Sequence, residues 1–376
     1  MLVDPATGAL SAVSSGVLQA CAEPGPGAAP GAEAGTGPPG AGGTGRDRTV
    51  VQHELFLEQV EVATPPCRDW GELESELRQG RRLVGGAARS AGVAAVAAGT
   101  PVLPHVDATV TPHHRYQQIC ASYGEVAREA LVCAMHVHVE VASDEEAVGV
   151  IDRIRPWLPV LLALSANSPY WRGLDTGFAS WRSQIWGRWP SSGPADLFGD
   201  PQTYHAVAQQ VIDSGAALDA GMLYFDARIS VDNPTVEIRV ADVCTDIADA
   251  ILVAAIVRAL VETTAREWRR GQQPADWRVD ELRVANWRAA KFGVADRLSH
   301  PLEHPVAPAA DVLATLADYV GDALDDAGDT QLVRSGLDRI LVTGSGADRQ
   351  RAALEAGGGL VAVVADLRER TEASWS

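Results

Sequence analysis

Lysine is almost absent from this chain of 376 residues, in which Lys291 is the only one. A P-loop of the form GxxxxGK[ST] needs a lysine beside the phosphates, and no such segment occurs in the sequence. Arginine supplies nearly all of the positive charge instead. A phosphate bound to this chain must therefore be held by arginine side chains, by backbone N–H groups or through a metal ion.

The sequence also lacks the patterns of disulfide-linked, zinc-binding and membrane-spanning proteins. Its five cysteines are scattered, odd in number and without CxxC spacing, which favours thiols in a reducing compartment. The opening MLVDPATGAL has neither the basic segment nor the apolar run of a signal peptide. The longest apolar stretch carries Asp249 and Arg258 and is too short to cross a bilayer. We therefore predict a cytoplasmic protein with no membrane partner.

Negative charge is in excess, because the formal net charge at pH 7 is −18. A surface of this sign repels the phosphates of nucleic acids and the head groups of anionic lipids, so neither is expected as a partner. A surplus of carboxylates is also what multivalent cations bind. Hydrophobic residues make up 46% of the chain, which is typical of a globular protein with a sizeable core.

Composition divides the chain into three segments. Residues 1–21 predict a short strand and a turn, residues 22–48 are rich in Gly, Pro and Ala and predict a flexible insertion, and residues 49–376 predict a single domain. Strands are expected in HELFLEQVEVATPP, GVAAVAAGT, AMHVHVEV, FDARIS and TVEIRVAD. Helices are expected in CRDWGELESELRQGRRL, in the segment after Ser143 until Pro156 and Pro159 interrupt it, over residues 246–268, 280–291 and 309–332, and after TGSGADRQR. This alternation predicts an α+β fold with a mostly antiparallel sheet.

The segment CAMHVHVEV alternates polar and apolar residues from His136 onward, which is the period of a strand with one buried and one polar face. The segments TVEIRVAD, FDARIS and EQVEVAT alternate in the same way. If these strands pair, their apolar sides pack on helices and their polar sides form one surface. That surface would carry Glu61, His136, His138, Glu140, Asp226, Arg228, Glu237 and Arg239.

Periodicity alone leaves three interpretations of this polar face open: an ordinary solvated surface, a transition-metal site built on the histidines, or a site for Mg²⁺ and a nucleotide. The mixture of acids and arginines suits the third in particular. Carboxylates hold Mg²⁺, and arginines grip phosphate or carboxylate groups through two parallel hydrogen bonds. Together they could bind a nucleoside triphosphate and an acidic substrate for phosphoryl transfer.

Several long segments resemble one family, the carboxylate–amine ligases known as glutamate–cysteine ligase type 2. They are ELFLEQVEVATPPCRD, CAMHVHVEV, LLALSANSPYWRGLDTGFASWRSQIWGRWP, PTVEIRVADVCTDIADA and GSGADRQR, in the same order from about residue 53 to 372. The resemblance implies a ligase that depends on ATP and Mg²⁺, with a glutamine-synthetase-like fold in which helices cover one face of a curved antiparallel sheet. Such enzymes phosphorylate the γ-carboxylate of glutamate, and an amine, cysteine in the family name, attacks the acyl phosphate.

The resemblance also implies roles for individual residues. Glu54, Glu61 and Glu237 match Mg²⁺ carboxylates, and Arg239 matches the arginine that faces the transferred phosphate or the substrate carboxylate. His136 matches a histidine beside the nucleotide, and we expect His138 and Arg228 to support it. Among the tryptophans of the segment WRSQIWGRWP, Arg182 and Arg188 are expected to bind the anionic substrate. The segment GSGADRQR resembles a phosphate-binding loop, but a structural helix cap is the preferred interpretation.

Two departures from the family pattern define the alternatives. Family members usually begin with a strand reading roughly GVEEEF, and Met1 stands where that strand ends, so the N-terminal segment is expected to be truncated. Glu140 stands where the family has glycine. The main alternative is therefore a ligase-like binding or regulatory protein with impaired catalysis, and a further one is a metal-dependent hydrolase that uses His136 and His138. The apolar helix over residues 251–260 allows a homo-oligomer.

Overall fold

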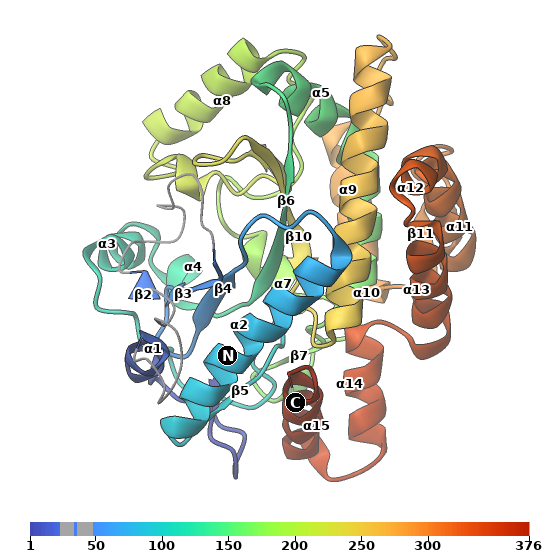
Figure 1. Ribbon diagram of the computed structural model, residues 1–376. Helices are drawn as coiled ribbons and strands as arrows, with labels where there is room; N and C mark the ends of the chain where they lie inside the picture. Colours follow the sequence, from blue (N-terminus) through green and yellow to red (C-terminus); the bar gives the residue numbers. More distant parts are fainter. Residues whose placement is uncertain (23–33, 36–47, 376) are drawn as a thin grey trace.

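The computed structural model describes residues 1–22, 34–35 and 48–375, which combine many helices with small, mostly antiparallel sheets (Figure 1). This is the α+β architecture that the sequence predicts. The predicted flexible insertion, residues 22–48, lies almost entirely outside the described residues, and the three-segment division stays a prediction. Within it, Ala34–Gly35 form the short strand β2, which pairs parallel with β3 (Val50–His53).

The polar face lies on a three-stranded antiparallel sheet of order β6-β10-β9. Its strands are β6 (Ala134–Glu140), β10 (Thr235–Asp242) and β9 (Ala227–Ile229). Glu237 in the middle strand lies directly opposite His138 on one side and Arg228 on the other. Directly opposed residues project from the same face of a sheet. The alternating sequence pattern therefore brought these three side chains together correctly.

Helices cover the apolar side of this sheet. α6 (Leu158–Ser165) packs against β10, α9 (Ile247–Arg269) packs against β6, and α5 (Asp144–Ile154) packs against β9 and β10. Val236 and Ile238 point into the main hydrophobic core, where both are buried. Burial of this apolar face, at about 25 cal/mol per Å², is the main term that holds sheet and helices together.

Local signals set the ends of α5 and α6. The Ser143 hydroxyl caps α5 by accepting a hydrogen bond from the Glu146 N–H at 3.3 Å. Pro156 lies in the short 3₁₀-helix η1 (Arg155–Trp157), and Pro159 lies in the first turn of α6. A proline in a first turn removes no intrahelical hydrogen bond. The two prolines therefore divide the helical segment where the sequence predicts an interruption.

A second small sheet, of order β2-β3-β4, lies in the N-terminal part of the chain. β3 and β4 (Val60–Ala63) form an antiparallel pair in which Gln52 lies opposite Glu61. The segment HELFLEQVEVATPP, predicted as one strand, therefore contains the last residue of β3, a loop and the strand β4. Around them lie α1 (Ser14–Ala22), α2 (Trp70–Ser90) and the strand pair β1 (Leu2–Val3) and β5 (Ala94–Ala95).

The remaining elements connect these sheets and extend the helical layer. Between the two sheets in sequence come α3 (His114–Tyr123) and α4 (Glu125–Arg128), and between β6 and β9 come β7 (Tyr170–Trp171), β8 (Leu174–Asp175), α7 (Trp181–Trp186), α8 (Pro201–Asp213) and η2 (Ala220–Met222). After α9 come α10 (Val279–Phe292), β11 (Arg297–Ser299), β12 (Val306–Pro308), α11 (Ala309–Tyr319), α12 (Gly321–Ala327), α13 (Thr330–Thr343), α14 (Gly346–Glu355) and α15 (Gly359–Ala373).

Two predicted helix boundaries near the C-terminus are wrong. The helix predicted over residues 309–332 is divided into α11, α12 and the start of α13, with Gly328 in the left-handed conformation at φ 76° as the end of α12. The segment GSGADRQR was expected to precede a helix, whereas α14 begins inside it. Ser345 and Asp348 form a capping box at this start, so the segment is the structural cap that the sequence analysis preferred.

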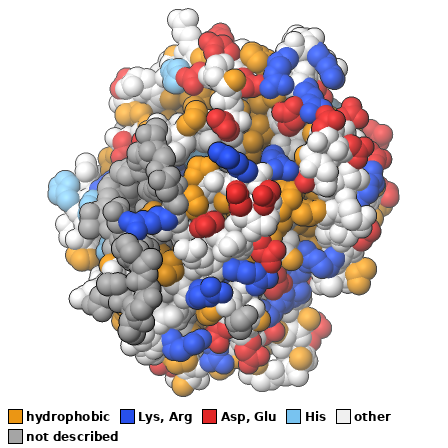
Figure 2. Space-filling model, in the orientation of Figure 1, with side chains coloured by type: hydrophobic (Ala, Val, Ile, Leu, Met, Phe, Trp, Pro, Cys, Tyr) orange, Lys and Arg blue, Asp and Glu red, His pale blue; other side chains and the backbone are white. Residues whose placement is uncertain are grey.

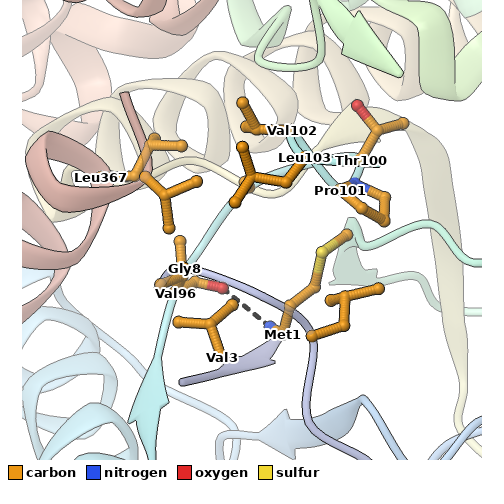
Figure 3. Close-up of a pocket in the computed structure, with 12 residues that line it drawn as sticks. Met1, Val3, Gly8, Val96, Thr100, Pro101, Val102, Leu103 and Leu367 are labelled. Atoms are coloured by element: carbon orange, nitrogen blue, oxygen red, sulfur yellow. Dashed lines mark hydrogen bonds between the residues drawn. The ribbon is translucent and has the colours of Figure 1, made fainter. Parts of the chain in front are cut away.

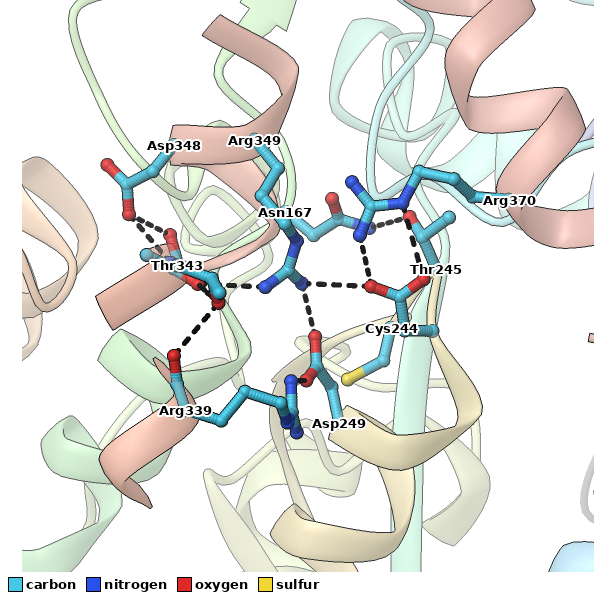
Figure 4. A network of polar contacts seen from close by, with 12 residues as sticks. Asn167, Cys244, Thr245, Asp249, Arg339, Thr343, Asp348, Arg349 and Arg370 are labelled. Carbon is cyan, nitrogen blue, oxygen red and sulfur yellow. Dashed lines mark hydrogen bonds and ion pairs between the residues drawn. The ribbon is translucent and has the colours of Figure 1, made fainter. Parts of the chain in front are cut away.

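Ion pairs fasten the C-terminal helices to the start of α9 (Figure 4). The Asp249 carboxylate accepts hydrogen bonds from Arg339 of α13, at 2.5 Å, and from Arg349 of α14. Asp246 pairs with Arg370 of α15. Because Asp249 is only 5% exposed, this contact is buried, and losing one partner would leave an uncompensated charge.

A small apolar pocket lies between the N-terminal strand and the last helix, lined by side chains that include Val3, Val96, Val102 and Leu367 (Figure 3). The amino group of Met1 donates a hydrogen bond to the Val96 carbonyl oxygen at 2.7 Å. The pocket carries no acid–base pair. In the part of the chain that the structure describes, none of the helices combines the length and the apolar character needed to cross a membrane.

Candidate active site

Glu237 is the centre of the polar face. Its carboxylate is 3% exposed and accepts hydrogen bonds from Arg239 and from Arg228 Nε, the latter at 2.7 Å. His136 Nδ1 and His138 Nε2 lie 3.4 Å and 4.0 Å from the same carboxylate oxygen, Oε1. Burial by itself would raise the pKa of Glu237, but Arg239, His136 and Arg228 together lower it far below its usual range. Glu237 is therefore ionised at neutral pH.

The two histidines are neutral at the same pH. Burial lowers the pKa of His136 well below its usual value, and the charge of Arg239 lowers it further. Burial also lowers the pKa of His138, although Glu237 opposes that shift. His138 Nδ1 lies within hydrogen-bond distance, 2.9 Å, of the Thr235 hydroxyl. A neutral ring has one N–H donor and one acceptor, and His138 already uses Nδ1 toward Thr235.

The two arginines that bind Glu237 differ in how much of their hydrogen-bonding capacity is used. Arg228 Nη1 donates to the carbonyl oxygens of three residues around η2: Ala220, Gly221 and Leu223. Arg239 lies over the ring of Tyr224, with its guanidinium carbon 5.6 Å from the ring centre. Its buried Nε has no hydrogen-bond partner among the described residues. A buried donor without a partner needs an explanation, and a catalytic role or a bound water are two of them.

Glu54 and Glu61 approach this face from the second sheet. Glu54 follows β3 directly, and its carboxylate accepts a hydrogen bond from the Leu55 N–H at 2.8 Å. Glu61 in β4 accepts one from Gln52 Nε2 at 2.8 Å. Burial and the neighbouring Glu61 charge raise the pKa of Glu54 to about 7, against the opposing charge of Arg239. The charge of Arg239 thus acts on Glu54, which indicates that the acidic pair lies within electrostatic range of the central sheet.

The acidic side chains near the central sheet offer oxygen donors to a hard divalent cation. Two carboxylates whose mutual repulsion raises a pKa are the oxygen ligands that Mg²⁺ prefers, and a bound cation would relieve that repulsion. Glu54 and Glu61 therefore fit. Glu237 uses its oxygens on Arg228 and Arg239, so its predicted metal contact stays a prediction. Among the described residues, no group of three or more His, Cys, Asp or Glu side chains is arranged to hold a metal ion.

The sequence patterns did not predict three residues that lie near Glu54 and Glu61. Arg115 of α3 binds Asp219 through two hydrogen bonds, at 3.1 Å and 2.9 Å. Burial and then the charges of Glu54 and Glu61 raise the pKa of the neighbouring Tyr116, and burial raises the pKa of Tyr224 to about 12. These residues lie in a helix and a loop, where no period-2 pattern could have linked them to the sheet.

The two arginines predicted to bind the anionic substrate have different surroundings. Arg182 is 2% exposed, and its guanidinium donates to the backbone carbonyls of Arg239 and Val240. It is therefore turned into the protein, and its predicted substrate contact stays a prediction. Arg188 is 41% exposed and pairs with Glu129, so it remains accessible and its substrate role stays a prediction.

Two further acids of the predicted surface have other partners or surroundings. Glu140 is exposed at the end of β6, opposite Thr235. Asp226, which precedes β9, accepts a hydrogen bond from Asn286 Nδ2 at 2.7 Å. Arg228, which the sequence places on the same face as Asp226, binds Glu237. Acidic and arginine side chains are also interspersed over the molecular face seen in Figure 2.

Comparison with known proteins identifies the family of this chain. The model of the family described as glutamate-cysteine ligase family 2 matches residues 2–366, nearly the whole chain. The chain belongs to glutamate–cysteine ligase family 2. The resemblance noted in the sequence is thereby confirmed. Within the family, a relative from Nocardioides sp. with the provisional name glutamate–cysteine ligase 2-1 is 49% identical over 338 residues, 89% of this chain and 88% of its own.

A second relative in glutamate–cysteine ligase family 2 comes from Streptomyces coelicolor and has the provisional name glutamate–cysteine ligase 2. It is 44% identical over 374 residues, which cover 100% of this chain and 97% of its own. Among solved structures, the glutamate–cysteine ligase of Francisella tularensis in complex with AMP matches with a TM-score of 0.66, over 87% of this chain and 82% of that chain. Its sequence is only 11% identical, so this likeness establishes the fold alone.

Proposed function

We propose that the protein is an ATP- and Mg²⁺-dependent carboxylate–amine ligase that joins glutamate to an amine through an acyl phosphate. The observation that carries the proposal is the position of the ionised Glu237, the neutral His136 and the partly unpartnered Arg239 on one face, beside Glu54 and Glu61. Family membership supports the ligase class. The AMP bound to the Francisella tularensis enzyme supports an adenine nucleotide as the second substrate.

In the first step of the proposed reaction, a side-chain carboxylate oxygen of the substrate attacks the γ-phosphorus of ATP and ADP leaves. Arg239 would neutralise the charge on the transferred phosphoryl group, and the unpartnered state of its Nε among the described residues supports this role. Glu237 fixes the direction of that guanidinium by accepting its Nη1 hydrogen bond. Glu54 and Glu61 would hold Mg²⁺, which supplies charge neutralisation of the triphosphate when it is bound.

In the second step, the nitrogen of the amine attacks the acyl carbon, and inorganic phosphate leaves with the oxygen that came from the carboxylate. The proton lost by the amine goes to solvent or to released phosphate. His136, held neutral by burial, and His138, whose pKa is also lowered although its side chain is 38% exposed, would donate hydrogen bonds to the nucleotide without adding positive charge. We propose cysteine as the amine because the relatives are named glutamate–cysteine ligases.

An ADP-release assay over a panel of carboxylates and amines tests the proposal. We expect release that requires ATP, Mg²⁺, glutamate and cysteine together, and that falls at least about 100-fold in Glu237→Gln. Glu262→Gln is a matched control, because Glu262 is 42% exposed and pairs with Arg266 on the surface of α9. Nucleotide binding without ADP release would favour the impaired, regulatory alternative. Bound zinc or iron without ATP turnover would favour the hydrolase.

A further inference from the structure

The strand that carries Arg239 is irregular at that residue. The pairing of β10 with β6 shifts register between Ile238 and Ala241, so that Arg239 and Val240 together lie opposite His136 alone. Such a β-bulge bends the strand, leaves part of the ladder unpaired and re-aims side chains, often beside an active site. The bulge therefore decides where the Arg239 side chain points.

One guanidinium group spans the bulge. Arg182 Nη2 donates to the carbonyl oxygen of Arg239 at 3.0 Å, and Arg182 Nη1 donates to the carbonyl oxygen of Val240 at 3.2 Å. Successive carbonyls of a regular strand point toward opposite edges, so a single side chain reaches both only where the strand is bulged. The contact is thus specific for the bulged conformation.

Arg182 is itself fixed by a fully buried carboxylate at the end of β10. Asp242 Oδ1 lies 3.7 Å from Arg182 Nη1 and accepts a hydrogen bond from the Ser180 hydroxyl at 2.8 Å. The other oxygen of Asp242 accepts one from the Ser168 hydroxyl at 2.6 Å, and that hydroxyl in turn accepts from the Arg182 N–H at 3.0 Å. The start of α7 is therefore locked to β10 immediately beyond the bulge.

We infer that Arg182 is a positioning residue, whose two hydrogen bonds to the bulge carbonyls direct the Arg239 guanidinium toward Glu237. This positioning role replaces the substrate contact that the sequence suggested for Arg182. The kinetic part of the inference rests on the proposed ligase function, whereas its structural part does not.

The kinetic test compares Arg182→Lys, Arg239→Lys and the double variant. Lysine has one terminal nitrogen, so it keeps the charge but cannot donate to both carbonyls in the same fork geometry. We expect Arg182→Lys to lower kcat about 10- to 100-fold, as misplacement of a reacting group does, with KM for glutamate changed by less than about 3-fold. The double variant should be no more than about 3-fold slower than Arg239→Lys, because both changes act through the same group.

Arg155→Lys is the matched control. Arg155 is also buried, at 4% exposed, and donates to the backbone carbonyls of Ala195 and Trp277. Its substitution should lower the Tm about as much as Arg182→Lys without lowering kcat. Should Arg182→Lys fail to fold, Ser180→Ala takes its place in the same comparison. This variant removes one hydrogen bond to Asp242, and we expect a several-fold fall in kcat. An unchanged kcat in either folded variant would overturn the inference.

Crystal structures of the same variants give a readout that needs no turnover. The inference expects a shifted register at Arg239–Val240 and a lost Arg239–Glu237 contact in Arg182→Lys, and an unchanged bulge in Arg155→Lys. A rise in KM with kcat retained, fully additive effects in the double variant, or an intact bulge in Arg182→Lys would each contradict it. If the wild-type protein releases no ADP, the proposed function fails, and the crystallographic comparison alone decides on the positioning role.

Discussion

Glu237 and Arg239 lie two positions apart on one strand and form a buried ion pair. A β-bulge that begins at Arg239 interrupts the regular pairing of β10 with β6. Both side chains nevertheless meet on the same face, with His136 3.4 Å from the shared carboxylate. This ion pair follows from the alternating sequence and the fold of the central sheet, and the proposed chemistry depends on it.

Replacing Glu237 by glutamine should affect stability as well as activity. The change removes the negative charge that compensates Arg228 and Arg239, so two buried guanidinium groups would remain without their counter-ion. Breaking a buried pair in this way costs about 3 kcal/mol. Urea unfolding of the wild type and of Glu237→Gln measures the free energy of unfolding. Equal midpoints for the two proteins would show that the pair carries no structural weight.

Mg²⁺ affinity should depend on Glu61 and on pH. Glu61→Gln is expected to raise the Mg²⁺ concentration needed for half-maximal ADP release at least about 10-fold. Glu74→Gln, which changes a surface glutamate paired with Arg78, should leave it unchanged. Because the pKa of Glu54 is raised to about 7, protons should compete with Mg²⁺ below that pH. Affinity that is equal at pH 6 and pH 8 would contradict the assignment of Glu54.

Glu54 should also make the metal-free protein less stable at alkaline than at acid pH. Its folded-state pKa of about 7 lies above the unfolded value, so the folded state binds the proton more tightly and stability is lost as pH rises toward 7. Glu54→Gln removes this penalty. Without Mg²⁺, we expect the substitution to stabilise the protein about 2 kcal/mol more at pH 8 than at pH 5. A difference of the opposite sign in denaturant unfolding would contradict the prediction.

The buried ion pairs of Asp249 should hold the C-terminal helices without taking part in the reaction. Asp249→Asn leaves the partly exposed Arg339 without this counter-charge and leaves Arg349 with Asp246 alone, which should lower the free energy of unfolding by about 1 to 3 kcal/mol. Asp318→Asn breaks an exposed pair with Arg334 and should change it by less than about 1 kcal/mol. ADP release per folded molecule should be unchanged in both variants. A selective loss of release in Asp249→Asn would link this network to the site.

The parts of the site that alternate in sequence could be predicted, because a strand of period 2 puts every second side chain on one face. His138, Glu237 and Arg228 are in register for this reason. Asp226 was misplaced because it precedes β9 and contacts Asn286 of α10 instead. Helix breaks after Tyr319 and at Gly328 were missed because apolar spacing continues across them.

Contacts between segments that are distant in the sequence could not be predicted, because they produce no local pattern of residues. The pairing of Arg115 with Asp219 joins residues 104 positions apart. The inward turn of Arg182 depends on the bulge and on Asp242, neither of which is visible in the spacing of the segment WRSQIWGRWP. For the same reason, the resemblance to a family could suggest an anion-binding role for Arg182, but only the packing shows what its guanidinium binds.

Transfer of a labelled oxygen from the carboxylate substrate to phosphate tests the proposed ligase reaction most directly. Wild-type protein would be incubated with ATP, Mg²⁺, cysteine and glutamate labelled with ¹⁸O in the side-chain carboxylate, and the phosphate would be examined by mass spectrometry. An acyl phosphate intermediate predicts one ¹⁸O atom in each phosphate released, together with γ-glutamylcysteine, and loss of both products in Glu237→Gln. Phosphate without the label, or amide formed at the same rate by Glu237→Gln, would contradict the mechanism.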